Sequence, residues 1–199
     1  SSFFHEGSLI PDEDQYLFLA LLASEGELTS DVMAGDGQKL FGSTRVFMWP
    51  LTGLFWVFGP TRFVAQLPAI LAGSMTAAGA AALADRLLRR PYALGAGLIV
   101  ALFPSQILWS SLVLRESLIW AGLTAVAVTV GVSQRKDSIL PLLWSSAALG
   151  LSFVALAWLR MQTAAIALWC AVAALSLAKS RRGVRMFLAT AVFLIAPWL

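Results

Sequence analysis

The residues best suited to do chemistry in this sequence are carboxylates near its start. Asp12, Glu13 and Asp14 follow Pro11 and precede the apolar run 16–22. A carboxylate can act as a general base on a hydroxyl or an amine, and several carboxylates together can hold a divalent metal. The same residues also suit the first turn of a helix, where the helix dipole favours negative charge. On these residues alone, both interpretations stay open.

Three further charged residues lie next to apolar segments, where a charge is costly and is by default a candidate for function. Arg115 and Glu116 follow a pair of serines, and Arg160 lies in a very short connection between two apolar segments. A cation there could face a lipid phosphate. The structural alternatives are an interfacial ion pair, or an arginine that snorkels to the lipid headgroups and anchors the chain.

Two other polar residues are weaker candidates. His5, the only histidine, has no partner motif that would favour a metal ligand or a proton carrier. Lys39 could bind phosphate, but a cation in an acidic loop more often balances charge. Cys170 is the only cysteine, which excludes a disulfide framework and a CxxC metal site.

The composition shows which solvent these residues meet. Hydrophobic residues make up 59% of the 199 residues and charged residues 13%, with a mean hydropathy of +0.79. Soluble domains carry roughly a quarter charged residues, so we expect an integral membrane protein. The formal net charge of +3 is then better interpreted by where the charges lie than by its size, and nucleic acid is a poor candidate for a partner.

The apolar segments predict an all-α, polytopic transmembrane bundle. Residues 1–45 are polar and acidic and predict a water-facing loop that contains one helix at the membrane surface. Residues 47–58 are apolar and aromatic but too short to span, which favours an interfacial or re-entrant segment. Five complete spans and part of a sixth are expected, at 62–83, 92–109, 112–132, 139–159, 163–178 and from Met186 onward. The predicted domains are therefore 1–60, outside the membrane, and 61–199, within it.

The connections between these spans predict their orientation. Lys and Arg gather in short cytoplasmic loops. Alternate connections here carry a cluster of basic residues: Arg86, Arg89, Arg90, Arg135, Lys136, Lys179, Arg181, Arg182 and Arg185. Only Asp85 and Asp137 oppose them. All three basic connections lie on the same predicted side, the cytoplasmic one. Residues 1–45 are therefore predicted to lie on the side opposite the cytoplasm.

Four motifs, in this order, resemble a known family. They are Pro11-Asp-Glu-Asp-Gln-Tyr16, similar to a first-loop DExxY signature; the proline-led segment 49–59, which closes in Phe-Gly; the arginine-headed segment 62–73; and the segment 102–116, in which a helix ends at proline, a serine lies on the outer turn and an acidic residue, Glu116, begins the next span. Their order and spacing resemble the polyprenyl-phosphate-sugar-dependent glycosyltransferases of the GT-C superfamily, especially the bacterial branch related to protein O-mannosyltransferases and lipid A aminoarabinose transferases.

The resemblance implies a reaction and a set of roles. A sugar on a polyprenyl phosphate would be the donor, and a glycan, lipid or protein outside the cytoplasm the acceptor. Asp12 would be the general base and Glu13 an auxiliary acid, with Tyr16 at the last motif position. Preorganised cations stabilise a departing phosphate, a role that falls to Arg115 and Arg160, with Glu116 holding Arg115.

Further expectations complete this interpretation. Lys39 is a further candidate for binding the lipid phosphate or sugar. We expect no cofactor and no obligatory metal, since no clean metal-ligand spacing is present, and a place in the bacterial cytoplasmic membrane. The family's first transmembrane helix and its later spans are absent, so we expect a piece of a longer protein.

Other classes of protein fit the same composition. A transporter is the main alternative, because charges in membrane segments also line substrate paths, although these charges gather at helix ends rather than at the midplane. A non-catalytic subunit of a cell-envelope assembly system would use the acidic loop only for contacts. A polysaccharide polymerase or ligase is a neighbouring enzyme class.

Overall fold

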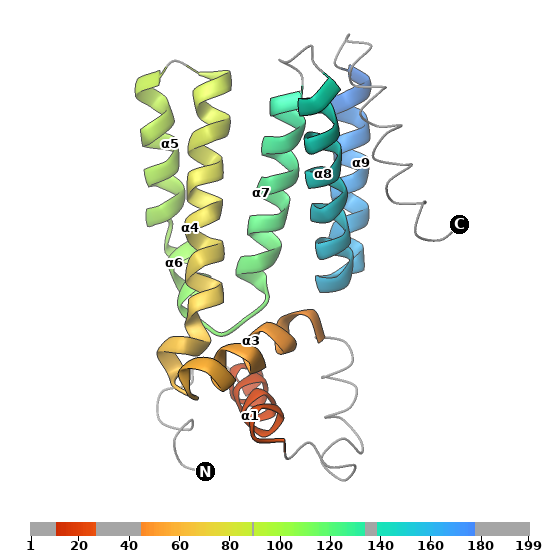
Figure 1. Cartoon of the computed structure of the whole chain (residues 1–199). Coiled ribbons are helices and arrows are strands. Elements are labelled where there is room, and N and C mark those ends of the chain that lie inside the picture. Colours follow the sequence, from red (N-terminus) through yellow and green to blue (C-terminus); the bar gives the residue numbers. More distant parts are fainter. Residues whose placement is uncertain (1–10, 27–44, 89, 134–138, 178–199) are drawn as a thin grey trace, which may run out of the picture. The chain divides into compact units, whose positions relative to one another are not determined.

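The computed structural model describes residues 11–26, 45–88, 90–133 and 139–177 (Figure 1). Within these ranges the regular structure consists of helices, with no strand, and the prediction of an all-α fold is confirmed. The chain divides into two compact units, Ser1–Gly73 with Pro104–Leu118, and Ser74–Phe103 with Ile119–Leu199. The predicted division at residue 60 distinguishes a part outside the membrane from a part within it, whereas these two units are defined by packing. The predicted division therefore stays a prediction.

Helix α1 (Pro11–Glu25) belongs to the first unit and confirms that a helix follows Pro11. Its buried face repeats at helical spacing through Glu13, Tyr16, Leu17 and Ala20. The helix ends at Gly26, whose φ of 75° is the left-handed conformation common just past a helix C-terminus. Because Glu13 lies on the apolar face, folding of α1 carries its carboxylate into the core.

Helix α3 (Arg45–Phe58) packs against α1 and covers the segment predicted to be interfacial. Its buried face comprises Met48, Leu51, Thr52 and Phe55, again at helical spacing. The ring of Phe47 meets that of Tyr16 edge to face, with centroids 5.5 Å apart. Trp49 and Trp56 lie at the border of this face, next to Thr52, and are exposed by 63% and 79%. Exposed tryptophans are common where a protein meets lipid headgroups.

A tight turn joins α3 to helix α4 (Arg62–Leu87). Gly59 adopts a φ of 83°, and its N–H donates to the carbonyl of Phe55 at 2.9 Å. The hydroxyl oxygen of Thr61 accepts the N–H of Val64 at 3.3 Å, which is the geometry of an N-cap. This cap makes Arg62 the first residue of α4 and fixes where its side chain leaves the helix.

The second unit contains the later part of α4, helix α5 (Arg90–Leu102), most of helix α7 (Glu116–Ser133), and helices α8 (Ile139–Leu159) and α9 (Met161–Leu177). Helices α8 and α9 lie side by side (Figure 1). A Cβ on Gly97 would lie 2.9 Å from Cβ of Ala81, and one on Gly122 would lie 2.8 Å from Leu156. At these two glycines the absence of a side chain lets the neighbouring helix approach closely.

The predicted span at 92–109 is wrong as one continuous helix. The chain breaks at Phe103 between α5 and helix α6 (Pro104–Ser111). Pro104 has no N–H to continue the ladder and disfavours helical geometry at the residue before it. The predicted start of the next span at residue 112 is also too early, because residues 112–115 form a non-helical segment. The helix α7 begins at Glu116, as the motif with an acidic residue at the start of this span predicts.

One helix in the described ranges, α4, is long and apolar enough to cross a membrane, and α5 with α6 would add a second if the bent pair is a single span. The other predicted spans are helices, but the apolar stretches Glu116–Gly131, Trp144–Leu159 and Met161–Ala174 are shorter. The segment from Met186 lies outside the described residues. These features indicate association with a membrane, while a polytopic bundle stays a proposal.

Candidate functional site

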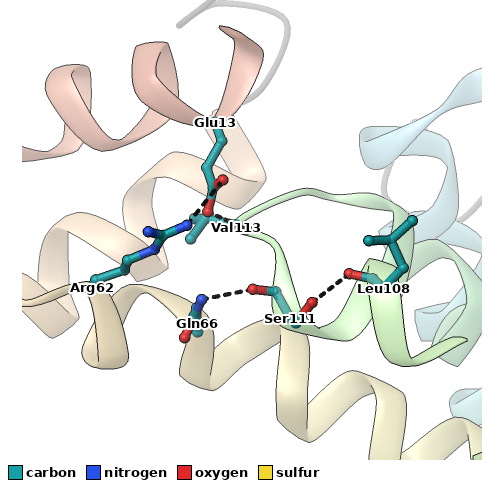
Figure 2. Close-up of polar contacts among 6 residues, drawn as sticks. All are labelled: Glu13, Arg62, Gln66, Leu108, Ser111 and Val113. Atoms are coloured by element: carbon teal, nitrogen blue, oxygen red, sulfur yellow. Dashed lines mark hydrogen bonds and ion pairs between the residues drawn. The ribbon is translucent and has the colours of Figure 1, made fainter. Parts of the chain in front are cut away.

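The carboxylate of Glu13 lies in the core of the first unit, with none of its surface exposed. Its Oε1 accepts the backbone N–H of Val113 at 3.3 Å, and its Oε2 lies 3.7 Å from Nη2 of Arg62 (Figure 2). An ionised carboxylate is buried only when charge or hydrogen-bond partners compensate for lost hydration. Glu13 has one of each, from segments far apart in the sequence.

The ion pair with Arg62 is a loose one. Its 3.7 Å separation exceeds that of a charge-assisted hydrogen bond. The Arg62 side chain is 40% exposed, so water screens part of the attraction. Oε2 of Glu13 has no hydrogen-bond partner among the described residues. Glu13 is therefore held mainly through Oε1, by the segment that contains Val113.

That segment, residues 112–115, connects α6 to α7 and is buried although it is not helical. Leu112, Val113 and Leu114 are exposed by 1%, 0% and 5%. Connections usually run over the surface because a buried backbone needs a partner for each polar group. Its burial therefore has to be supported by hydrogen bonds from neighbouring elements.

Two side-chain hydrogen bonds from other helices reach this region, one to the buried Val113 and one to the exposed Ser111 just before the segment. Glu13 of α1 accepts the Val113 N–H, and the Gln66 amide of α4 donates to the Ser111 carbonyl at 2.7 Å (Figure 2). Within the connection, the N–H of Leu114 donates to the Leu112 carbonyl at 2.9 Å. Nearby, the Ser117 hydroxyl donates to the Trp109 carbonyl at 2.6 Å. The conformation of residues 111–114 is thus fixed from both sides.

Arg115 and Glu116 follow this anchored segment directly. Both are partly buried, and Glu116 is the first residue of α7, where a negative charge suits the helix N-terminus. One carboxylate oxygen of Glu116 is buried without a hydrogen-bond partner in the described part of the chain. The predicted contact between Glu116 and Arg115 stays a prediction.

The other predicted site residues lie in different places. Asp12 is in the first turn of α1, but its side chain is outside the described residues, as are His5 and Lys39 entirely. Tyr16 is 4% exposed and packs on Phe47. Arg160 is exposed and joins α8 to α9 in the second unit. Its predicted role toward a lipid phosphate stays a prediction.

Sequence reasoning missed Arg62 and Gln66 as members of the site. They are four residues apart and so lie on one face of α4. The next positions of this face are Ala69, which is buried, and Gly73, where a Cβ would lie 2.8 Å from Cβ of Ser110. Polar residues followed by small ones along one face of an apolar helix were the available signal for a packed polar interface.

The described residues contain no group of three or more His, Cys, Asp and Glu side chains that could hold a metal ion. The expectation that no metal is required stays a prediction, because part of the acidic loop lies outside the described ranges. The arrangement in the first unit is a carboxylate, a guanidinium and an amide around a buried connection.

Comparison with protein-family models, with curated proteins and with solved structures finds no match to this chain. The resemblance to GT-C glycosyltransferases therefore depends on the four sequence motifs. Three of these motifs contribute residues to the contacts of Figure 2: the first loop through Glu13, the arginine-headed helix through Arg62, and the segment 102–116 through Val113.

Proposed function

We propose that this chain belongs to a membrane glycosyltransferase that moves a sugar from a polyprenyl-phosphate donor to an acceptor outside the cytoplasm. The chain would form a multi-pass bundle in a bacterial cytoplasmic membrane, with residues 1–45 on the outer side. The one long apolar helix and the shorter ones in the described ranges support this placement, as does the basic bias of alternate connections.

The observation that carries the proposal is the contact between Glu13 and Val113. It joins the acidic motif of α1 to the segment that presents Arg115, across a sequence separation of 100 residues. A glycosyltransferase of this kind needs a base for the acceptor and a cation for the leaving phosphate within one site. Asp12, the candidate base, is next to Glu13, and Arg115, the candidate cation, comes two residues after Val113. Both candidates therefore belong to the first unit.

The proposed chemistry assigns each residue a step. The acceptor hydroxyl oxygen attacks the anomeric carbon, and Asp12 takes its proton. The bond between the anomeric carbon and the phosphate oxygen breaks, and polyprenyl phosphate leaves with the electron pair. Arg115 stabilises the charge that this phosphate gains, since a cation placed there in advance favours the transition state. In this proposal Glu13 does not act as an acid, and instead holds α1, which carries Asp12, against the segment that precedes Arg115.

A transporter is the second candidate, because α5 and α6 form a bent pair of helices that is interrupted before Pro104. Discontinuous helices form the midplane substrate sites of many secondary transporters. The contacts of Glu13 favour the enzyme, because this buried carboxylate is paired with Arg62 and accepts the backbone N–H of Val113.

Reconstitution of the full-length protein in liposomes distinguishes the two candidates. The donors to test are polyprenyl phosphates that carry a hexose, a pentose or an aminopentose, each mixed with a membrane extract as the source of acceptor. We expect the protein to release polyprenyl phosphate from at least one of these donors. Liposomes without protein are the control. Uptake of a labelled sugar without any polyprenyl donor, together with no release of polyprenyl phosphate, would establish the transporter instead.

A further inference from the structure

The amide of Gln66 is placed to hold the backbone on which Arg115 depends. Its Nε2 donates to the exposed Ser111 carbonyl at 2.7 Å (Figure 2). Among the described residues, this is the shorter of two side-chain hydrogen bonds that reach residues 111–114 from other helices. Ser111 ends α6, so its carbonyl has no helical partner of its own. Gln66 supplies the donor for that carbonyl.

The two hydrogen bonds fix the segment at neighbouring points. Gln66 binds the carbonyl of Ser111, and Glu13 binds the N–H of Val113, two residues further on. Between and beyond them, Leu112 and Leu114 are buried and joined by their own backbone hydrogen bond at 2.9 Å. With both ends of this short stretch held, the backbone position from which the Arg115 side chain departs is set.

We propose that Gln66 is a positioning residue for Arg115 and thereby for the phosphate of a polyprenyl-phosphate lipid. This inference depends on the proposed function and adds to it a residue that acts through the backbone, without touching the lipid. Loss of the amide frees the Ser111 carbonyl and lets the segment shift. The guanidinium of Arg115 then spends less time where it meets phosphate, and affinity for the lipid falls.

The test measures binding of polyprenyl phosphate to full-length protein in detergent. Gln66→Met keeps the length and volume of the side chain but has no donor, and Gln66→Glu has the same shape and no donor when ionised. Both should weaken binding about fivefold, the equivalent of one neutral hydrogen bond. If Gln66→Met does not fold, Gln66→Glu carries the measurement.

Two comparisons separate positioning from general damage. Gln106→Met removes a similar amide in the same unit, 3.5 Å from the Gly73 carbonyl, and should bind the lipid as wild type does. In an Arg115→Ala background, Gln66→Met should cause no further loss of binding, because the residue it positions is absent. A merely structural role would weaken binding equally in both backgrounds.

The outcomes are distinct for the two proposals. If the wild-type protein binds polyprenyl phosphate, and Gln66→Met and Gln66→Glu bind it equally well, the positioning role alone is overturned. The positioning role is also overturned if Gln66→Met causes the same loss of binding in the Arg115→Ala background as in the wild type. Wild-type protein that binds no polyprenyl phosphate overturns the proposed function and this inference together.

Discussion

Replacing Glu13 with alanine is expected to lower the free energy of unfolding by about 2 to 4 kcal/mol. The substitution leaves the N–H of Val113 buried without a partner, which costs about 1 to 3 kcal/mol. It also removes the carboxylate that Arg62 faces, a smaller loss because Arg62 is 40% exposed. The cavity left in the core of the first unit adds to the effect. Thermal unfolding in detergent measures it.

Two variants make this measurement specific. Glu13→Gln keeps an oxygen that can accept the Val113 N–H and should lose less than half as much stability as Glu13→Ala. Glu25→Ala removes an exposed carboxylate from the other end of α1 and should change the stability little. If Glu13→Ala and Glu25→Ala unfold at the same temperature, Glu13 is not a buried anchor and the contact in Figure 2 has no energetic role.

The second large effect is on activity. Asp12→Asn in the full-length protein should reduce sugar transfer by about 10²- to 10⁴-fold, because an amide cannot take the proton of the acceptor hydroxyl. The change is nearly isosteric, so the unfolding temperature should stay that of the wild type. Single-turnover release of polyprenyl phosphate measures the rate after the donor has bound.

Glu25→Gln is the matched control, since it neutralises a carboxylate of the same helix at its exposed end and should transfer sugar at the wild-type rate. The donor should bind Asp12→Asn as tightly as wild type, which would assign the loss to the chemical step. Transfer by Asp12→Asn at the wild-type rate would show that another group is the base, and Glu13 would then be the first to test.

The sequence predicted which segments become helices better than where those helices end. The apolar runs at 139–159 and 163–178 correspond closely to α8 and α9. The run at 92–109 is predicted as one span because it is apolar on average and carries no charge, yet Pro104 divides it, as the proline of the fourth motif indicates. Hydropathy averages over residues, whereas a single missing N–H acts at one position.

The candidate site was predictable only in part. The acidic motif and Arg115 attract attention because charges next to apolar segments are unusual. Nothing local to the sequence shows that Glu13, rather than a neighbouring carboxylate, is the one whose side chain reaches Val113. That outcome depends on how α1 packs, a long-range property. Gln66 carries no charge, so its residue type indicates no role, although its amide binds the Ser111 carbonyl directly before that segment.

The proposed glycosyl transfer depends most on Arg115 facing the phosphate of a polyprenyl lipid, and binding of that phosphate can be measured without knowledge of the sugar or the acceptor. Polyprenyl phosphate, the leaving group for every such donor, should bind the wild-type protein about 10- to 100-fold more tightly than Arg115→Ala, the range for a charge-assisted hydrogen bond. Arg90→Ala, which removes the same charge on the predicted cytoplasmic side, should bind it as the wild type does. Equal affinity of wild type and Arg115→Ala for polyprenyl phosphate would contradict the account.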